Sequence, residues 1–251
     1  MSEVIGCIEV LPNPLALAHH VAEWIVEAAT AAQGSFRVSL SGGSTPKTLY
    51  GLLASNEFKP RFPWERVSWY WGDERFVPYD DPESNFRMTR EAMLAKAPVP
   101  SENIHPVPTD GSPEDAARRY ELTLQQAYGG ATLDPHRPLF DVTLLGLGPD
   151  GHTASLFPHS PGLSERQAWV LANWVEKFGT HRLSLSFPVL DAGTAVLFLV
   201  AGADKEWALH QVLQGGASVA DVPARGVRPA TGALTFLVDR AAAAGLVLRS
   251  A

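Results

Sequence analysis

The sequence predicts an α/β fold with a doubly wound, mostly parallel sheet, helices on both faces and room for a small subsidiary lobe. Apolar segments at 142–145 and 194–201 have the composition of strands covered on both faces, and residues 36–40 form a further predicted strand. Segments with helical periodicity alternate with them, and each of these strands runs into a turn that contains glycine. The 251 residues contain no repeat and no long linker, so we expect one domain spanning residues 1–251.

Composition excludes several classes of protein. The formal net charge is −7, so the chain lacks the basic surplus that non-specific nucleic-acid binding needs. Cys7 is the only cysteine, which excludes an internal disulfide and a cysteine-rich zinc site. The amino terminus lacks the apolar region of a signal peptide, and no run approaches roughly 18 apolar residues. We therefore expect a cytoplasmic protein without membrane contact, and the residues do not distinguish a monomer from a dimer.

The first predicted element is a helix that begins at Pro14, with Asn13 as its capping residue. Gly34 follows its last turn and ends it. Its apolar stripe consists of Leu17, Val21, Trp24, Ile25 and Ala28.

The segment Ser41–Lys47 connects the strand at 36–40 to a second helix, in which Ser44 or Thr45 is the expected cap and Pro46 the first helical residue. A strand, a glycine loop and a helix amino terminus together aim backbone N–H groups at one point, which favours a phosphate. The spacing of glycine and lysine does not match a Walker loop. Taken alone, the segment is equally well explained as a plain strand-to-helix turn.

A strand from Val67 to Gly72 ends in the charged residues Asp73, Glu74 and Arg75. Its aromatic content favours a strand. We interpret Glu74 as part of a solvated edge, the usual place of a charge cluster. Asp73 and Arg75 follow the end of a buried strand, where open α/β sheets bind their ligands.

Two helices are predicted in the next part of the chain. Residues 80–85 are rich in turn formers, and residues 86–96 form a helix. A further helix begins with a capping box from Ser112 to Asp115 and ends at Gly129. Its apolar stripe consists of Ala116, Tyr120, Leu124 and Ala127.

The segment 140–158 carries the central strand and a glycine turn formed by Gly146, Gly148 and Gly151. These glycines match the dinucleotide fingerprint, which requires a long helix after the turn. The prolines at 149, 158 and 161 exclude such a helix. What remains is a turn after a buried strand that exposes Asp150 and His152.

The last third of the chain continues the alternation. Segments 169–174 and 181–187 are predicted strands, and the polar residues that alternate with Leu183 and Leu185 indicate one exposed face. The strand at 194–201 leads into a helix with Lys205 in its first turn, where a cation opposes the helix dipole. Arg225 and Arg228 lie in a basic loop at 223–229, and a strand at 234–238 precedes a short alanine-rich helix.

Six motifs stand in a characteristic order along nearly the whole chain. They are Ser-Leu-Ser-Gly-Gly-Ser-Thr-Pro at 39–46, Trp-Gly-Asp-Glu-Arg-Phe-Val-Pro at 71–78, Ser-Asn at 84–85, Gly-Leu-Gly-Pro-Asp-Gly-His-Thr-Ala-Ser-Leu-Phe-Pro at 146–158, Arg-Leu-Ser-Leu-Ser-Phe-Pro at 182–188 and Ala-Gly-Ala-Asp-Lys at 201–205. Together they resemble the 6-phosphogluconolactonases, which form one family with the glucosamine-6-phosphate deaminases.

Two differences favour the lactonase branch over the deaminase branch. The deaminase pattern has a catalytic glutamate five residues after the histidine, where this chain has Phe157, which cannot transfer protons. It also reads Asp-Glu-Tyr where this chain has Asp-Glu-Arg at 73–75. The resemblance therefore implies hydrolysis of 6-phospho-D-glucono-1,5-lactone to 6-phospho-D-gluconate, in the oxidative pentose phosphate pathway. It implies neither a cofactor nor a metal, and His152 and His159 lack the i, i+4 spacing of helical metal ligands.

The candidate catalytic residues are His152, Asp73 and Arg75. Lactone hydrolysis needs an activated water, so we assign His152 as general base and, when protonated, as acid to the leaving ring oxygen. Asp150 is expected to be too constrained to touch the same ring, so we assign it to the turn or to a substrate hydroxyl. Asp73 orients His152 or binds substrate hydroxyls, and Arg75 stabilises the oxyanion or binds phosphate.

Other hypotheses for the mechanism and for the function are less favoured. A serine nucleophile at Ser44 or Ser155 is a weaker hypothesis, because neither lies in a Gly-x-Ser-x-Gly elbow. Two alternatives to the lactonase remain open, namely a glucosamine-6-phosphate deaminase or isomerase and a catalytically silent sugar-phosphate sensor.

The resemblance also supplies residues for a bound phosphate. The predicted donors and cations for the phosphate are Gly42, Gly43, Ser44, Thr45, Arg182 and Lys205.

Overall fold

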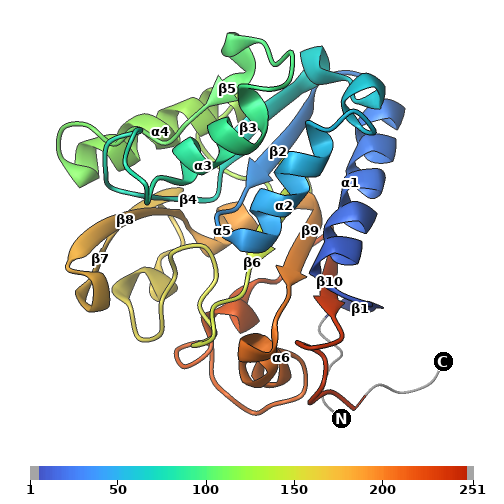
Figure 1. Cartoon of the computed structure of the whole chain (residues 1–251). Coiled ribbons are helices and arrows are strands. Elements are labelled where there is room, and N and C mark those ends of the chain that lie inside the picture. Colours follow the sequence, from blue (N-terminus) through green and yellow to red (C-terminus); the bar gives the residue numbers. More distant parts are fainter. Residues whose placement is uncertain (1–5, 248–251) are drawn as a thin grey trace.

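The computed structural model describes residues 6–247, whose strands form two sheets (Figure 1). The larger sheet has the order β1-β10-β9-β6-β2-β3-β5 with parallel neighbours throughout, and the smaller has the antiparallel order β4-β8-β7. The strands are β1 (Cys7–Leu11), β2 (Phe36–Leu40), β3 (Val67–Trp71), β4 (Asp73–Arg75), β5 (Ile104–His105), β6 (Phe140–Gly146), β7 (Val170–Val175), β8 (Thr180–Leu185), β9 (Gly193–Val200) and β10 (Ala233–Asp239).

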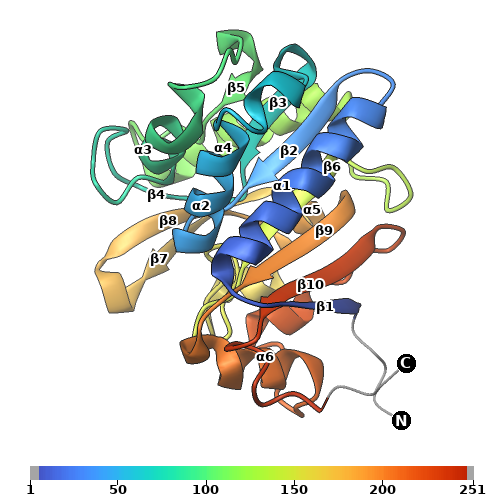
Figure 2. The ribbon, with the colours of Figure 1, turned by 45° about the vertical axis from the view of Figure 1, so that its right-hand side comes forward.

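Helices cover both faces of the larger sheet, which confirms the predicted α/β architecture. In Figure 2, α1 and α2 lie in front of the strands and α4 lies behind them. Within the described part of the chain, no helix has the length and apolar character that crossing a membrane requires. The helices are α1 (Pro14–Ala31), α2 (Ser44–Leu53), α3 (Asn85–Thr89), α4 (Pro113–Tyr128), α5 (Phe187–Leu190) and α6 (Glu206–Leu213).

The central strands β6 and β9 are buried on both faces, as their uniform apolar composition predicts. Val142, Leu144 and Val196 are at most 1% exposed. In the next pair of strands, Phe198 of β9 and Phe236 of β10 are register partners whose rings stack with centroids 4.7 Å apart. This continuous apolar layer fixes where the carboxyl ends of the strands lie.

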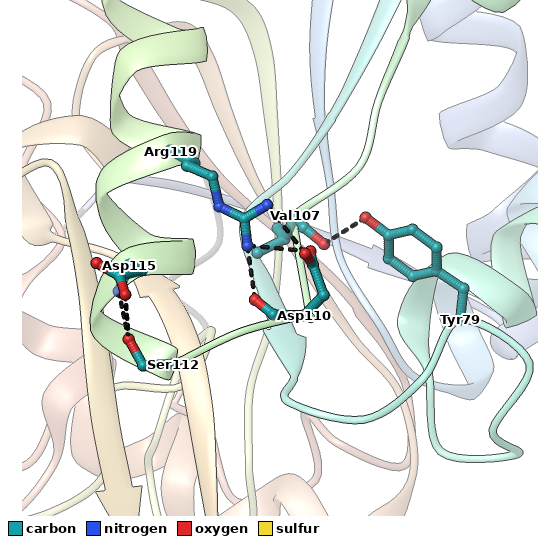
Figure 3. Close-up of polar contacts among 6 residues, drawn as sticks. All are labelled: Tyr79, Val107, Asp110, Ser112, Asp115 and Arg119. Carbon is teal, nitrogen blue, oxygen red and sulfur yellow. Dashed lines mark hydrogen bonds and ion pairs between the residues drawn. The ribbon is translucent and has the colours of Figure 1, made fainter.

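The predicted helix caps of α1 and α4 are confirmed. The Asn13 side chain accepts from the backbone N–H of Ala16 at 2.9 Å. Ser112 Oγ accepts from the backbone N–H of Asp115 at 3.1 Å, a contact drawn in Figure 3. Gly129 ends α4 in the left-handed conformation that glycine adopts without strain.

Polar contacts hold the proline-spaced segment that precedes α4 (Figure 3). Arg119 donates to the carboxylate of Asp110 at 3.0 Å and to its carbonyl at 2.6 Å, and this hydrogen bonding lowers the pKa of Asp110. The Tyr79 hydroxyl donates to the Val107 carbonyl at 2.9 Å. The segment is therefore attached both to α4 and to the loop that follows β4.

The interpretation of Glu74 as a solvated residue is wrong. Glu74 is 1% exposed, and its carboxylate accepts from the backbone N–H groups of Asn85 and Phe86, both at 2.7 Å. It thereby caps the amino terminus of α3, although it lies in β4. Burial raises the pKa of Glu74 to about 7, against these donors, which lower it.

The predicted exposed face of the strand at 181–187 is also wrong. Arg182 and Ser184 are 6% and 1% exposed, because β8 is the middle strand of the smaller sheet, between β4 and β7. Ser184 Oγ accepts from the backbone N–H of Ser155, 29 residues earlier in the chain. The polar residues of β8 therefore face a polar interior instead of water.

Four further elements differ from the prediction. The helix expected at 86–96 is α3 followed by a π-helical turn over Arg90–Leu94. Residues 240–245, expected to be helical, form turns. The short strands β1 and β5 were not predicted.

Candidate active site

A cavity of 380 Å³ lies where β2, β6 and β9 end, at the carboxyl edge of the larger sheet. The smaller sheet contributes Asp73, Arg75 and Arg182 to the same cavity. Asp150 is the only predicted site residue outside its lining. Those that line it are Gly42, Gly43, Ser44, Thr45, Asp73, Arg75, His152, Arg182 and Lys205.

The loop between β2 and α2 presents an uncapped helix terminus to the cavity. Contrary to the prediction, the helix begins at Ser44 and its N-cap is Gly43, with φ +109° and no side-chain hydrogen bond to the cap. A Cβ at Gly42 would lie 2.1 Å from the Asn85 side chain, so a larger residue there would displace Asn85, which is hydrogen-bonded to Asp73. The loop thus leaves the positive end of α2 available to an anion.

Asp73 is hydrogen-bonded to Ser155 and Asn85, two residues that were not predicted to contact it. Its carboxylate accepts from Ser155 Oγ at 2.7 Å, and its carbonyl accepts from the Asn85 side chain at 3.0 Å. Asp73 is 8% exposed and Ser155 is 2% exposed. Asp73 was predicted either to orient His152 or to bind substrate hydroxyls. The structure shows no hydrogen bond between Asp73 and His152, so it does not support the first role. The only feature of the sequence that pointed to Asn85 as a site residue was its place in the Ser-Asn motif at 84–85.

The residue that holds His152 is Asp150. Its Oδ1 is hydrogen-bonded to Nδ1 of the imidazole, so the expectation that the turn keeps the two side chains apart is wrong. The turn is closed by a hydrogen bond from the Gly148 N–H to the His152 carbonyl at 2.8 Å. A Cβ at Gly148 would lie 2.0 Å from His152 Nδ1, so this glycine makes the room for the pair.

The carboxylate of Asp150 is ionised at neutral pH. Burial acts to raise the pKa of Asp150, but the hydrogen bond and charge of His152 outweigh it and lower the pKa to about 2. An ionised carboxylate on Nδ1 leaves Nε2 as the nitrogen that can exchange protons with a ligand. The ring of His152 packs against Phe157, with ring centroids 4.4 Å apart.

Two arginines face each other across the smaller sheet. Arg75 of β4 and Arg182 of β8 are register partners, and both line the cavity. Like charges in that position destabilise a sheet. Arg182 Nη1 is buried, and it has no hydrogen-bond partner among residues 6–247. Burial and the neighbouring Arg75 lower the pKa of Arg182.

The remaining cation, Lys205, directly precedes α6. Its Nζ lies 2.9 Å from Asp204 Oδ2, while its side chain is only 23% exposed. Within the described ranges, no cluster of three or more histidine, cysteine, aspartate or glutamate side chains is arranged to hold a metal ion.

Together, an ionised carboxylate that holds an imidazole and a buried guanidinium whose Nη1 has no hydrogen-bond partner among the described residues define the site of an α/β enzyme. The chemistry they support is acid–base catalysis on an anionic substrate. The family described as glucosamine-6-phosphate isomerases/6-phosphogluconolactonase matches residues 12–236, so the chain belongs to this family.

Individual relatives match over nearly their whole length. The 6-phosphogluconolactonase of Nostoc sp. is 41% identical over 243 residues, which cover 95% of this chain and 98% of the relative. That of Rattus norvegicus is 36% identical over 245 residues, covering 95% and 93%. The solved structure of the 6-phosphogluconolactonase from Trypanosoma brucei has a TM-score of 0.82 at 30% identity and covers 98% of this chain and 100% of that chain.

Proposed function

We propose that this protein hydrolyses 6-phospho-D-glucono-1,5-lactone to 6-phospho-D-gluconate. The names of the relatives support this reaction, and so does the resemblance in the sequence. The observation that carries the proposal is that one cavity contains both the Asp150-held imidazole of His152 and the guanidinium of Arg182, whose Nη1 has no hydrogen-bond partner among residues 6–247.

His152 is the general base in the proposed mechanism. Asp150 binds Nδ1, so Nε2 removes a proton from a water molecule, which attacks the C1 carbonyl of the lactone. The tetrahedral intermediate collapses as the C1–O5 bond breaks, and the imidazolium returns the proton to the leaving ring oxygen. The charge of Asp150 stabilises the imidazolium between these two steps.

The phosphate is assigned to the cations and to the uncapped end of α2. Arg182 lacks a partner for Nη1, and an anion in the cavity would supply one. Because Arg75 opposes Arg182 in register, we assign it to the same anion, which relieves the repulsion between the two arginines. Lys205 and the Gly43–Thr45 backbone add a charge and N–H donors.

The two alternative functions have weaker support. A deaminase needs a further acid–base residue near the imidazole, and the ring that packs on His152 is Phe157. A silent sensor has no need of a carboxylate that orients the imidazole, and this chain retains the Asp150–His152 pair.

The test is hydrolysis of freshly generated 6-phosphogluconolactone by the purified protein, with the spontaneous opening of the lactone subtracted. Unphosphorylated gluconolactone and glucosamine 6-phosphate serve as parallel substrates. We expect rapid turnover of the phosphorylated lactone alone. Ammonia release from glucosamine 6-phosphate would instead establish the deaminase, and binding without turnover of any substrate would establish the sensor.

A further inference from the structure

The tip of the hairpin between β7 and β8, residues 176–179, reaches the active-site cavity. Val175 and Thr180 are the last register pair before the tip, and Gly179 has a left-handed φ of +58°. Phe178 lines the cavity and is 48% exposed.

The tip lies against the turn that carries the catalytic base. Lys177 Nζ is 3.9 Å from Asp150 Oδ2, the carboxylate oxygen that His152 Nδ1 does not bind. The ring of Phe178 meets Phe157 edge to face, with centroids 5.9 Å apart, and Phe157 in turn packs on His152. Lys177 therefore lies near the turn itself, and Phe178 contacts the ring that packs on His152.

Phe178 also lies beside the buried cation. The Arg182 guanidinium carbon is 5.1 Å from the centroid of the Phe178 ring. Arg182 is 6% exposed, and its Nη1 has no hydrogen-bond partner in the described part of the chain. An aromatic face attracts a guanidinium without neutralising it, whereas a carboxylate in the same place would compete with the phosphate.

We propose that Phe178 is a positioning residue for Arg182 and thereby a determinant of specificity for phosphorylated lactones. The ring holds the guanidinium toward the cavity and leaves its charge for the ligand. This inference rests on the proposed function, because it assigns to Phe178 the selection of the phosphate that Arg182 binds.

The experiment compares Phe178→Ala, Phe178→Leu and Phe178→Tyr with the unmodified protein. Leucine keeps apolar bulk without an aromatic face, and tyrosine keeps the face. Trp174→Ala is the matched control, since Trp174 is 52% exposed on the same hairpin and packs on His181, outside the lining of the cavity. The readouts are kcat and KM for the phosphorylated lactone, and the Kd of 6-phosphogluconate by calorimetry, which needs no turnover.

We expect the alanine and leucine variants to raise KM and Kd about tenfold with kcat within about twofold, the size of a lost cation–π contact. Tyrosine restores both constants, and Trp174→Ala changes neither. Unchanged KM and Kd in Phe178→Ala, or an equal effect of Trp174→Ala, would overturn the inference. If the unmodified protein does not turn over the lactone, the proposed function fails, and the Kd series alone still decides the role of Phe178.

Discussion

The molecule has a second cavity, at the opposite edge of the sheet, and the two cavities differ in a way that volume does not reveal. The second measures 520 Å³ against 380 Å³ for the active-site cavity. It is lined by residues that precede the strands, among them Trp169 before β7, Asp191 before β9 and Arg228 before β10. By size alone it would be the better candidate for a ligand site.

The difference lies in how the charged groups of each cavity are satisfied. In the second cavity, Asp191 Oδ1 accepts from the Arg228 backbone N–H at 2.7 Å, and Arg166 donates to the Leu163 carbonyl at 2.8 Å. In the active-site cavity, the buried Nη1 of Arg182 has no such partner within residues 6–247. A buried donor without a partner carries a cost that a ligand can remove. The buried donor without a hydrogen-bond partner therefore favours the smaller cavity as the ligand site, although the other cavity is larger.

The largest effect is expected from His152→Ala. Without the general base, kcat for the phosphorylated lactone falls by about a thousandfold. The Kd of 6-phosphogluconate stays within about threefold, because the cations that bind it are intact. Steady-state kinetics and calorimetry measure the two quantities. A comparable loss of affinity would mean that the imidazole is a binding contact.

The next largest effect is expected from Asp150→Asn. The pKa of Asp150 is lowered to about 2, so the carboxylate stays charged down to about pH 3 and stabilises the imidazolium throughout the working range. Its loss lowers kcat by about 10- to 100-fold and moves the acid limb of the kcat/KM profile to lower pH. A pH profile with an unmoved acid limb would contradict the role given to Asp150.

Arg182→Met should separate binding from stability. The variant loses a phosphate contact, so KM for the phosphorylated lactone rises by about 10- to 100-fold. The melting temperature should hold or rise, because an apolar isostere removes a buried charge that opposes Arg75. The kcat for the phosphorylated lactone serves as the control, because the loss of a binding contact alone leaves it largely unchanged. A strong loss of thermal stability would show that Arg182 is structural.

The smallest effect on activity is expected from Asp191→Asn in the second cavity, with kcat/KM within about twofold of the unmodified protein. Burial raises the pKa of Asp191 to about 7, so between its ordinary pKa and about 7 the folded state holds a proton that the unfolded state releases. The free energy of unfolding therefore falls as pH rises through this window, by at most about 1.4 kcal/mol per pH unit.

Asp191→Asn removes this contribution. Glu74, whose pKa is also raised to about 7, keeps its own part of the slope. Denaturant unfolding at several pH values measures the change. A variant that loses activity, or one whose stability keeps the full pH dependence, would break the contrast between the two cavities.

Sequence reasoning succeeded where one local pattern decides the structure. The apolar segments became β6 and β9, the strand predicted at 36–40 is β2, and the Asn13 and Ser112 caps are present. It failed for Glu74 and Arg182, because their burial depends on pairing between β4 and β8, which lie about a hundred residues apart. A short polar strand looks like a solvent edge until the strand that covers it is known.

The candidate site shows the same division. The glycines at 42–43 and 146–151 located it, since strands that end in glycine turns converge at one edge of a parallel sheet. The contact between Asp150 and His152 was missed, because it depends on a turn closed by the Gly148 N–H and the His152 carbonyl. The Asp73–Ser155 bond joins residues 82 apart in the chain, which no local pattern reveals.

The most direct test of the central claim is a crystal structure with 6-phosphogluconate bound. We expect the phosphate within hydrogen-bond distance of Arg182 Nη1 and beside the amino terminus of α2, with C1 next to His152 Nε2. A phosphate bound in the cavity that holds Asp191, or one turned away from Arg182, would contradict the claim that unsatisfied charge marks the active site.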